Sequence, residues 1–315
     1  NTIAFNAMSG TLAGLNQLNG GAALTKTSAG VLIMGAANAY TGPTNVTDGV
    51  MQVGVAGVGT TGSGLVSVAK SSATYANASV ISGSGTIQGA LVVGDIANAA
   101  NRGVLSPGDG AHGSNNATLT ITAAGGLTIA AGSQTRLGVT SATGMDAAFA
   151  ASGLTASAYL ASLSSTSDGV AGTAPAAWFA QPTGGSVDFL NLTNLAGTLP
   201  LGNNGGSAAA GEGIVLIFNN GLTLGSLAPG QIFNMVDWYG AFSGSFSAGS
   251  TYSTGGINGD FDLPDISSTG FSWDTSAFMT HGVLAVSAYI IPEPSRALLL
   301  LVGFMLLTLR RRRND

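Results

Sequence analysis

Glycine is the feature that most constrains this fold, because it occupies 49 of the 315 positions, more than twice its usual share of roughly 7%. The chain has no Gly-X-Y period and only nine prolines, which excludes collagen. Apolar residues make up 45% of the sequence, enough for a large core. Short β-type segments separated by Gly, Asn and Ser therefore predict an all-β protein whose corners are glycine.

Composition also limits the chemistry that is expected. The chain contains no cysteine, which excludes disulfides, thiol nucleophiles and Cys-ligated zinc. Of its two histidines, His112 lies in a Gly- and Asn-rich loop and His281 lies in the C-terminal region expected to be a β cap, so neither suggests a Ser-His-Asp arrangement. Residues 1–290 carry twelve acidic and four basic side chains, a net charge of −8, so nucleic acid is an unfavourable partner. We expect no cofactor, no metal site and no catalytic residues.

Residues 290–313 differ from the rest of the chain. A Pro-Glu-Pro-Ser motif is followed by an uncharged, leucine-rich run and an arginine cluster. The residues are Pro292, Glu293, Pro294 and Ser295, then Arg310, Arg311, Arg312 and Arg313. A helix of this length spans about 20 Å, short of a hydrocarbon core near 30 Å. The uncharged run nevertheless predicts one short transmembrane helix at 296–309. Because arginines favour the cytoplasmic side of a membrane, we expect the rest of the chain, the body, to be exported.

This tail resembles the PEP-CTERM sorting signal of Gram-negative bacteria in the order and spacing of its three parts. The resemblance implies an exosortase-type membrane protease as partner. It also implies a precursor held transiently in the inner membrane, then localisation at the cell surface or in the extracellular matrix. A permanent tail anchor and an apolar core helix are the alternatives.

Residues 24–54 contain short β-type pieces at 31–34, 44–46 and 50–53, with turns at Gly42-Pro43 and Asp48-Gly49. The segment resembles the autotransporter-associated β-strand repeat. The residues that carry the likeness are Leu24-Thr25-Lys26-Thr27, Gly30, Asn38-Ala39-Tyr40-Thr41-Gly42 and Gly49-Val50-Met51-Gln52-Val53. The resemblance implies a right-handed parallel β-solenoid (β-helix), which we expect over residues 1–143.

The remaining chain is divided by its composition. Residues 144–185 are rich in Ala and Ser and are expected to be an insertion that is partly helical. Residues 186–289 are expected to form a C-terminal β cap that covers the last rung. The N-terminus shows no initiator Met and no apolar export signal, so we expect that signal upstream in a longer precursor.

Several candidate sites have structural interpretations that we favour. Residues 57–62 match G-x-G-x-x-G, but a strand rather than a helix is expected to follow. The carboxylates of Asp260, Asp262 and Asp265 have a spacing that calcium could use, although a surface turn is favoured. The basic residues Lys26, Lys70, Arg102 and Arg136 are spread along the chain, and Lys26 is expected to be solvated. The tryptophans, Trp178, Trp238 and Trp273, are expected to be buried rather than to stack on sugars.

The sequence therefore predicts an exported, non-enzymatic structural protein of the cell surface or biofilm matrix. The first alternative is an adhesin that binds exopolysaccharide through the solenoid flank or through exposed aromatic residues. The second is a polysaccharide lyase or hydrolase, which would need positioned carboxyl groups or a base beside cations.

Overall fold

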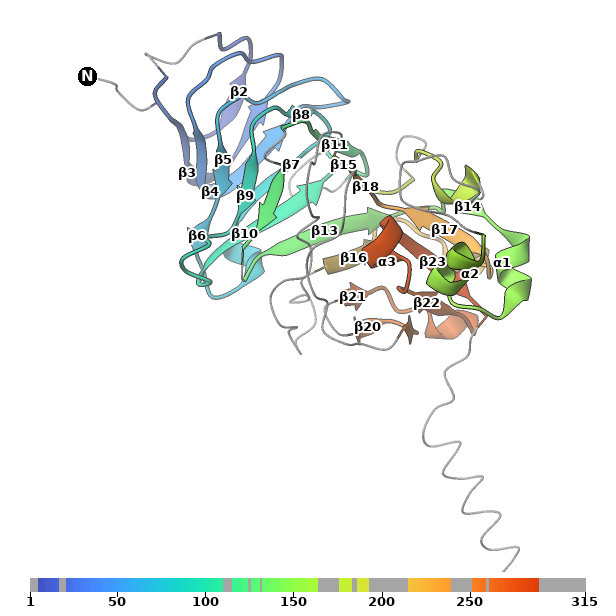
Figure 1. The fold of residues 1–315 in the computed structure, drawn as a ribbon. Coiled ribbons are helices and arrows are strands. Elements are labelled where there is room, and N and C mark those ends of the chain that lie inside the picture. Colours follow the sequence, from blue (N-terminus) through green and yellow to red (C-terminus); the bar gives the residue numbers. More distant parts are fainter. Residues whose placement is uncertain are drawn as a thin grey trace, which may run out of the picture.

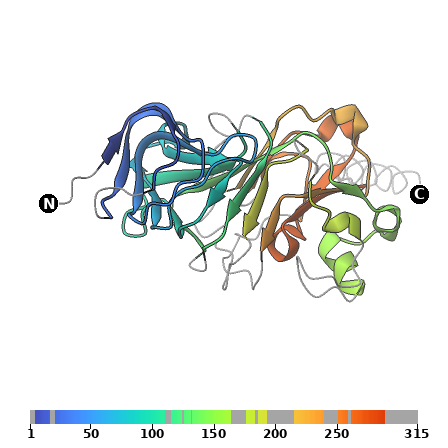
Figure 2. The ribbon, with the colours of Figure 1, turned by 90° about the horizontal axis from the view of Figure 1, so that it is seen from above.

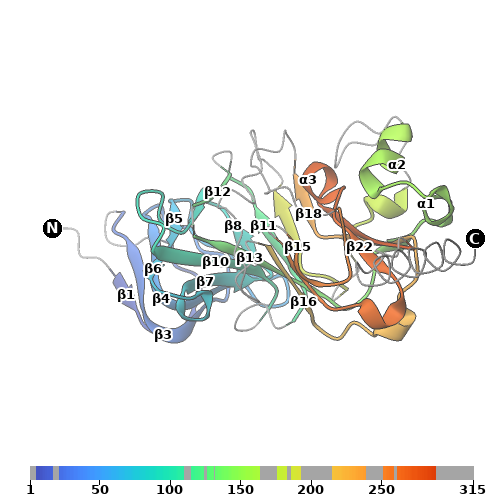
Figure 3. The same ribbon diagram turned by 90° about the horizontal axis from the view of Figure 1, so that it is seen from below.

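Short strands dominate the computed structural model, which describes residues 5–16, 21–109, 115–123, 126–130, 132–163, 176–182, 186–192, 215–238, 251–258 and 261–288. The described strands form sheets of fourteen, four and five strands. The N-terminal strands lie at one end of the molecule, and the helices α1 (Ala147–Ser152) and α2 (Ala156–Ser162) lie at the other (Figures 1, 2 and 3).

The large sheet contains β1 (Phe5–Ala7), β2 (Gly10–Leu12), β3 (Leu24–Met34), β4 (Thr44–Val53), β5 (Val66–Val68), β6 (Lys70–Ser71), β7 (Ser79–Gly83), β9 (Leu91–Val93), β10 (Asn101–Pro107), β12 (Leu127–Ile129), β13 (Gln134–Val139), β16 (Val215–Asn219), β20 (Gly256–Asn258) and β21 (Phe261–Leu263). The four-stranded sheet contains β8 (Thr86–Ile87), β11 (Thr118–Ile121), β15 (Phe189–Leu192) and β18 (Val236–Trp238). The five-stranded sheet contains β14 (Gly144–Met145), β17 (Gln231–Asn234), β19 (Tyr252–Ser253), β22 (Ser272–Asp274) and β23 (Val283–Ser287). Shorter helical elements are η1 (Tyr75–Asn77), η2 (Ala176–Trp178), η3 (Leu224–Ser226), η4 (Ser267–Thr269) and α3 (Phe278–His281).

Parallel pairing between strands far apart in the sequence builds most of the first two sheets. In one row of partners, Leu24 pairs with Thr44, Thr44 with Val66, Val66 with Leu91, and Leu91 with Leu127. All five of these side chains are buried, as expected where alternate residues of each strand face the core. The sequence separation between partners lengthens along this row, from Leu24–Thr44 to Leu91–Leu127.

The predicted right-handed parallel β-solenoid with a C-terminal β cap is wrong. Every strand pair of the five-stranded sheet is antiparallel, and β6–β10 and β20–β21 are antiparallel as well. The large sheet is also branched, since β3 pairs with β1, β2 and β4. Because the separation between partners is uneven, the strands do not repeat as rungs of constant length. Strands that are close in the sequence, such as β20 and β21, pair antiparallel instead.

The transmembrane part of that prediction is not supported either. Within the described ranges, no helix is both long and apolar enough to cross a membrane. The predicted helix at 296–309 and the sorting motif lie outside the described residues, as does the whole of segment 290–313.

Local predictions from the sequence fared better. The strands expected at 31–34, 44–46 and 50–53 are present in β3 and β4. The turn predicted at Asp48-Gly49 is instead a register shift within the continuous strand β4. Gly49 has φ +67° there, and a Cβ would overlap the carbonyl oxygen of Ser28. The helical interpretation of 144–185 is confirmed by α1 and α2.

One hydrophobic cluster joins the sheets, with buried residues from all three, among them Leu32, Leu119 and Phe233. A second cluster packs α1 and α2 against the five-stranded sheet. In it, the ring centroids of Phe149 and Trp178 lie 5.1 Å apart. Burial of this kind stabilises a fold by about 25 cal/mol per Å² of apolar surface. The first cluster is therefore continuous across residues 1–143 and 186–289, which the sequence suggested were separate regions.

Asp188, just before β15, is a buried polar link between two sheets. Its Oδ2 accepts a hydrogen bond from the Gly138 amide of β13 at 2.7 Å, and its Oδ1 accepts from the Ala117 amide before β11 at 3.2 Å. The side chain is fully buried. Burial raises the pKa of Asp188 to about 8, against the opposing effect of the two amide hydrogen bonds.

Asp188 predicts that stability falls as pH rises. Because its pKa is higher in the folded than in the unfolded chain, its contribution is complete below about pH 4 and is lost progressively toward pH 8. We expect a loss on the order of 2 kcal/mol in unfolding free energy between pH 6 and pH 8. Urea unfolding of the wild type and of Asp188→Asn measures it. Burial also raises the pKa of Asp274, and this residue adds the same pH dependence to both proteins. The unfolding free energy should therefore fall more steeply with pH in the wild type than in Asp188→Asn, and equal slopes would contradict the prediction.

Candidate functional site

Lys26 of β3 occupies an inward position of the sheet. It pairs with Val46, which continues the row to Val68, and all three side chains are fully buried. The Nζ donates to the Ser28 carbonyl oxygen, to Ser28 Oγ at 3.4 Å and to the Asp48 carbonyl oxygen at 3.1 Å. Burial lowers the pKa of Lys26, while the negative charge of Asp48 opposes that shift. The prediction that Lys26 is solvated is therefore wrong.

Asp48 connects Lys26 to the next segment of the chain. Its Oδ1 accepts from Lys70 Nζ at 2.6 Å and from the Gly49 amide at 2.7 Å. The hydrogen bond from Lys70 is the largest cause that holds the pKa of Asp48 below its ordinary value. The side chains of Lys70 and Asp48 are 32% and 29% exposed, so this ion pair is accessible to solvent.

Arg102 of β10 lies beside Lys70. The two residues are direct partners in the antiparallel pair β6–β10. The guanidinium carbon of Arg102 lies 4.5 Å from the ring centroid of Tyr75, which is itself buried. We call Lys26, Asp48, Lys70 and Arg102 the basic corner. It unites three of the four basic residues of 1–290, which sequence reasoning treated as dispersed.

Asn38 and Tyr40 make further polar contacts in the repeat segment. Asn38 Oδ1 accepts from the Leu15 amide at 2.9 Å, and Asn38 Nδ2 donates to the Thr60 carbonyl oxygen at 2.7 Å. Tyr40 is fully buried, and its hydroxyl is 2.6 Å from Thr44 Oγ1. Asn38 thus connects its own segment to the segments that contain Leu15 and Thr60. Its side chain provides hydrogen-bond partners for backbone groups that would otherwise lack them.

Glycines permit these segments to approach closely. A Cβ at Gly42 would overlap the carbonyl oxygen of Ala22, one at Gly64 would overlap that of Gly42, and one at Gly89 would overlap that of Gly64. None of Gly42, Gly64 and Gly89 has a positive φ, so glycine is required there only because a Cβ would clash with the neighbouring backbone. The Gly42 position of the repeat is therefore a packing requirement rather than a ligand-binding feature.

The other candidates mostly have structural roles. The G-x-G-x-x-G stretch at 57–62 lies between β4 and β5 with no helix after it, as predicted. Asp262 is buried in β21, and Asp265 Oδ1 accepts from the Ser267 amide at 2.8 Å within a turn. Asp260 lies outside the described residues. In the part of the chain that is described, no group of three or more acidic or histidine side chains could hold a metal ion.

The remaining aromatic and imidazole candidates are accounted for. Trp178, Trp238 and Trp273 are all buried, which confirms the prediction. His281 is half-buried at the end of α3, where burial lowers its pKa. His112 lies outside the described residues, as do Pro292, Glu293, Pro294, Ser295, Arg310, Arg311, Arg312 and Arg313.

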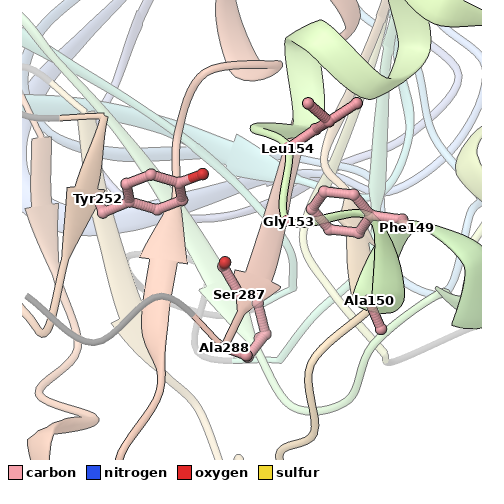
Figure 4. A pocket seen from close by; sticks show the side chains of 8 residues that line it. Phe149, Ala150, Gly153, Leu154, Tyr252, Ser287 and Ala288 are labelled. Atoms are coloured by element: carbon pink, nitrogen blue, oxygen red, sulfur yellow. The ribbon is translucent and has the colours of Figure 1, made fainter.

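A small cavity lies beside the five-stranded sheet, near α1 (Figure 4). Its volume is about 190 Å³, and its lining is mainly apolar, with the hydroxyl groups of Tyr252 and Ser287 as polar elements. No carboxylate, imidazole or cation is among its lining residues in the described part of the chain. The basic corner is therefore the more promising site, because it combines accessible charge with fixed geometry.

The glycine packing predicts the effect of a single methyl group. Gly42→Ala should lower the unfolding free energy by about 1–3 kcal/mol, because the Cβ must displace the Ala22 carbonyl. Gly225→Ala is the matched control, since a Cβ there meets no atom within 4 Å. Urea unfolding measures both variants. Similar stability of Gly42→Ala and Gly225→Ala would show that the approach of these backbones is looser than described.

Comparison with known proteins identifies one segment. The passenger-associated transport repeat family (PATR) matches residues 24–53, which span β3 and β4. A search of curated proteins and a search of solved structures found no match. The chain thus carries an autotransporter-associated repeat, which contributes Lys26, Asp48, Asn38 and Tyr40 to the contacts above. This repeat indicates a passenger-like, exported or surface protein.

Proposed function

We propose that this chain is an exported, non-enzymatic structural protein of the cell surface or extracellular matrix, sorted by an exosortase-type membrane protease. The observation that carries the proposal is the passenger-associated repeat at 24–53. The side chains of this repeat contribute to chain packing: Lys26 and Asn38 donate hydrogen bonds to backbone carbonyl oxygens, and Gly42 leaves room for a neighbouring backbone. A segment with these contacts serves as a scaffold rather than as a reaction centre.

The sequence of the tail supports the sorting step. Two prolines keep the residue before each of them out of the α region, so the Pro292-Glu293-Pro294 motif favours an extended conformation that a protease can bind. An uncharged run and four arginines follow. Arginines adjoining such a run favour the cytoplasmic side, which would leave the body on the opposite side of the membrane.

The charge arrangement supports a non-enzymatic role. A glycosidase needs two carboxyl groups that face a bound sugar. At the basic corner the carboxylate present is Asp48, and it is held by Lys70 and by the Gly49 amide. A second candidate function, binding of a matrix polysaccharide, is favoured by the accessible cations at this corner and is developed below.

The sorting proposal predicts the mass of the mature protein. In a Gram-negative host with an exosortase, the wild-type body should reach the surface without residues 296–313. Pro292→Ala combined with Glu293→Gln should keep the tail and remain in the membrane fraction. Asp315→Asn, which removes an acid outside the motif, is the control and should be processed normally. Intact-mass spectrometry of the fractions distinguishes these cases.

Wild-type protein that reaches the surface with residues 296–313 still attached would contradict the processing step. Normal cleavage of the Pro292→Ala, Glu293→Gln variant would contradict the role of the motif.

A further inference from the structure

The basic corner concentrates positive charge in an acidic protein. Lys70 and Arg102 are direct cross-strand partners, and such residues have Cβ atoms about 5 Å apart, where like charges destabilise a sheet. Asp48 forms an ion pair with Lys70 at 2.6 Å, and it is the carboxylate of this corner. The body as a whole carries a net charge of −8 over residues 1–290. The local sign is therefore opposite to the sign of the surrounding protein.

The cations of the corner have different roles. Lys26 points inward and donates to carbonyl and hydroxyl oxygens of its own and the next strand, so it contributes to packing. Lys70 is partly exposed. Arg102 is half-buried, and its guanidinium carbon lies over the Tyr75 ring, a contact that restrains the side chain. Tyr75 is anchored in turn by its packing with Val80 and Val104. The guanidinium is thus positioned before any ligand arrives, which reduces the entropy lost on binding.

From this geometry we propose that Lys70 and Arg102 form a binding site for the carboxylate groups of an acidic polysaccharide. A guanidinium binds a carboxylate through two parallel hydrogen bonds, and the ammonium beside it supplies a second charge. This inference rests on the proposed extracellular function, which brings the body into contact with matrix polymers.

Charge density favours a uronate polymer over nucleic acid as the occupant. Duplex DNA carries one negative charge per about 1.7 Å, and the acidic body would repel most of that charge. A polyuronate carries one carboxylate per sugar, a lower charge density along the chain than that of duplex DNA, so the acidic body repels it less. Binding should therefore be local, of modest affinity and sensitive to salt.

Binding of polygalacturonate by the full-length chain tests the site. Replacing both cations, Lys70→Gln and Arg102→Gln, should weaken binding about tenfold. Arg136→Gln is the matched control, because Arg136 lies outside the corner on β13 and its Nε donates to Gln134 at 2.6 Å. Neutral dextran should not bind. Any contribution of the C-terminal arginines is common to all variants.

A variant with the opposite effect guards against misfolding as an explanation. Asp48→Asn removes the competing carboxylate while its backbone carbonyl still accepts from Lys26, so polygalacturonate binding should become tighter. Unchanged affinity in the Lys70→Gln, Arg102→Gln protein would overturn the site, as would an equal loss in Arg136→Gln or equal binding of dextran or single-stranded DNA. Failure of tail processing with binding intact would count against the sorting proposal alone.

Discussion

The structure depends on close approach between backbones that are distant in the sequence. Parallel neighbours in a sheet lie about 4.8 Å apart, and their connecting segments must approach equally closely. At Gly42, Gly64 and Gly89 a single Cβ would overlap the carbonyl oxygen of the preceding segment. The row of inward side chains that begins at Leu24 can form because these positions carry no side chain. Abundant glycine is thus a condition for the stacking of the strands.

The basic corner follows from the same pairing. Once β3 and β4 are in register, the Lys26 ammonium reaches the Asp48 carbonyl, and the Asp48 carboxylate reaches Lys70. The antiparallel strand β6 then places Lys70 opposite Arg102. Four charged residues separated along the sequence therefore meet because their strands do. The repeat therefore supplies Lys26 and Asp48, and the neighbouring strands β6 and β10 supply Lys70 and Arg102, on which our binding proposal rests.

Sequence reasoning succeeded where local pattern decides the outcome. It located the pieces of β3 and β4, the helices of 144–185 and the burial of the tryptophans. The alternation in Leu24-Thr25-Lys26 also placed Lys26 on the same face as Leu24, a signal of burial that was overlooked. The five-stranded antiparallel sheet was missed because partners such as Ile232 and Ala285 are far apart, and no local period records their pairing. The convergence of Lys70 and Arg102 was missed for the same reason.

The central claim is that β3 and β4, the strands of the passenger-associated repeat, are held by parallel pairing to neighbours on both sides. Native-state hydrogen exchange measured by NMR tests it most directly. The account predicts that the amides of Leu24 in β3 and Thr44 in β4, which donate to the carbonyl oxygens of Pro43 and Leu65, exchange as slowly as those of the central strand β10, near the limit of global unfolding. Rapid exchange of these two amides, with protection retained in β10, would contradict it.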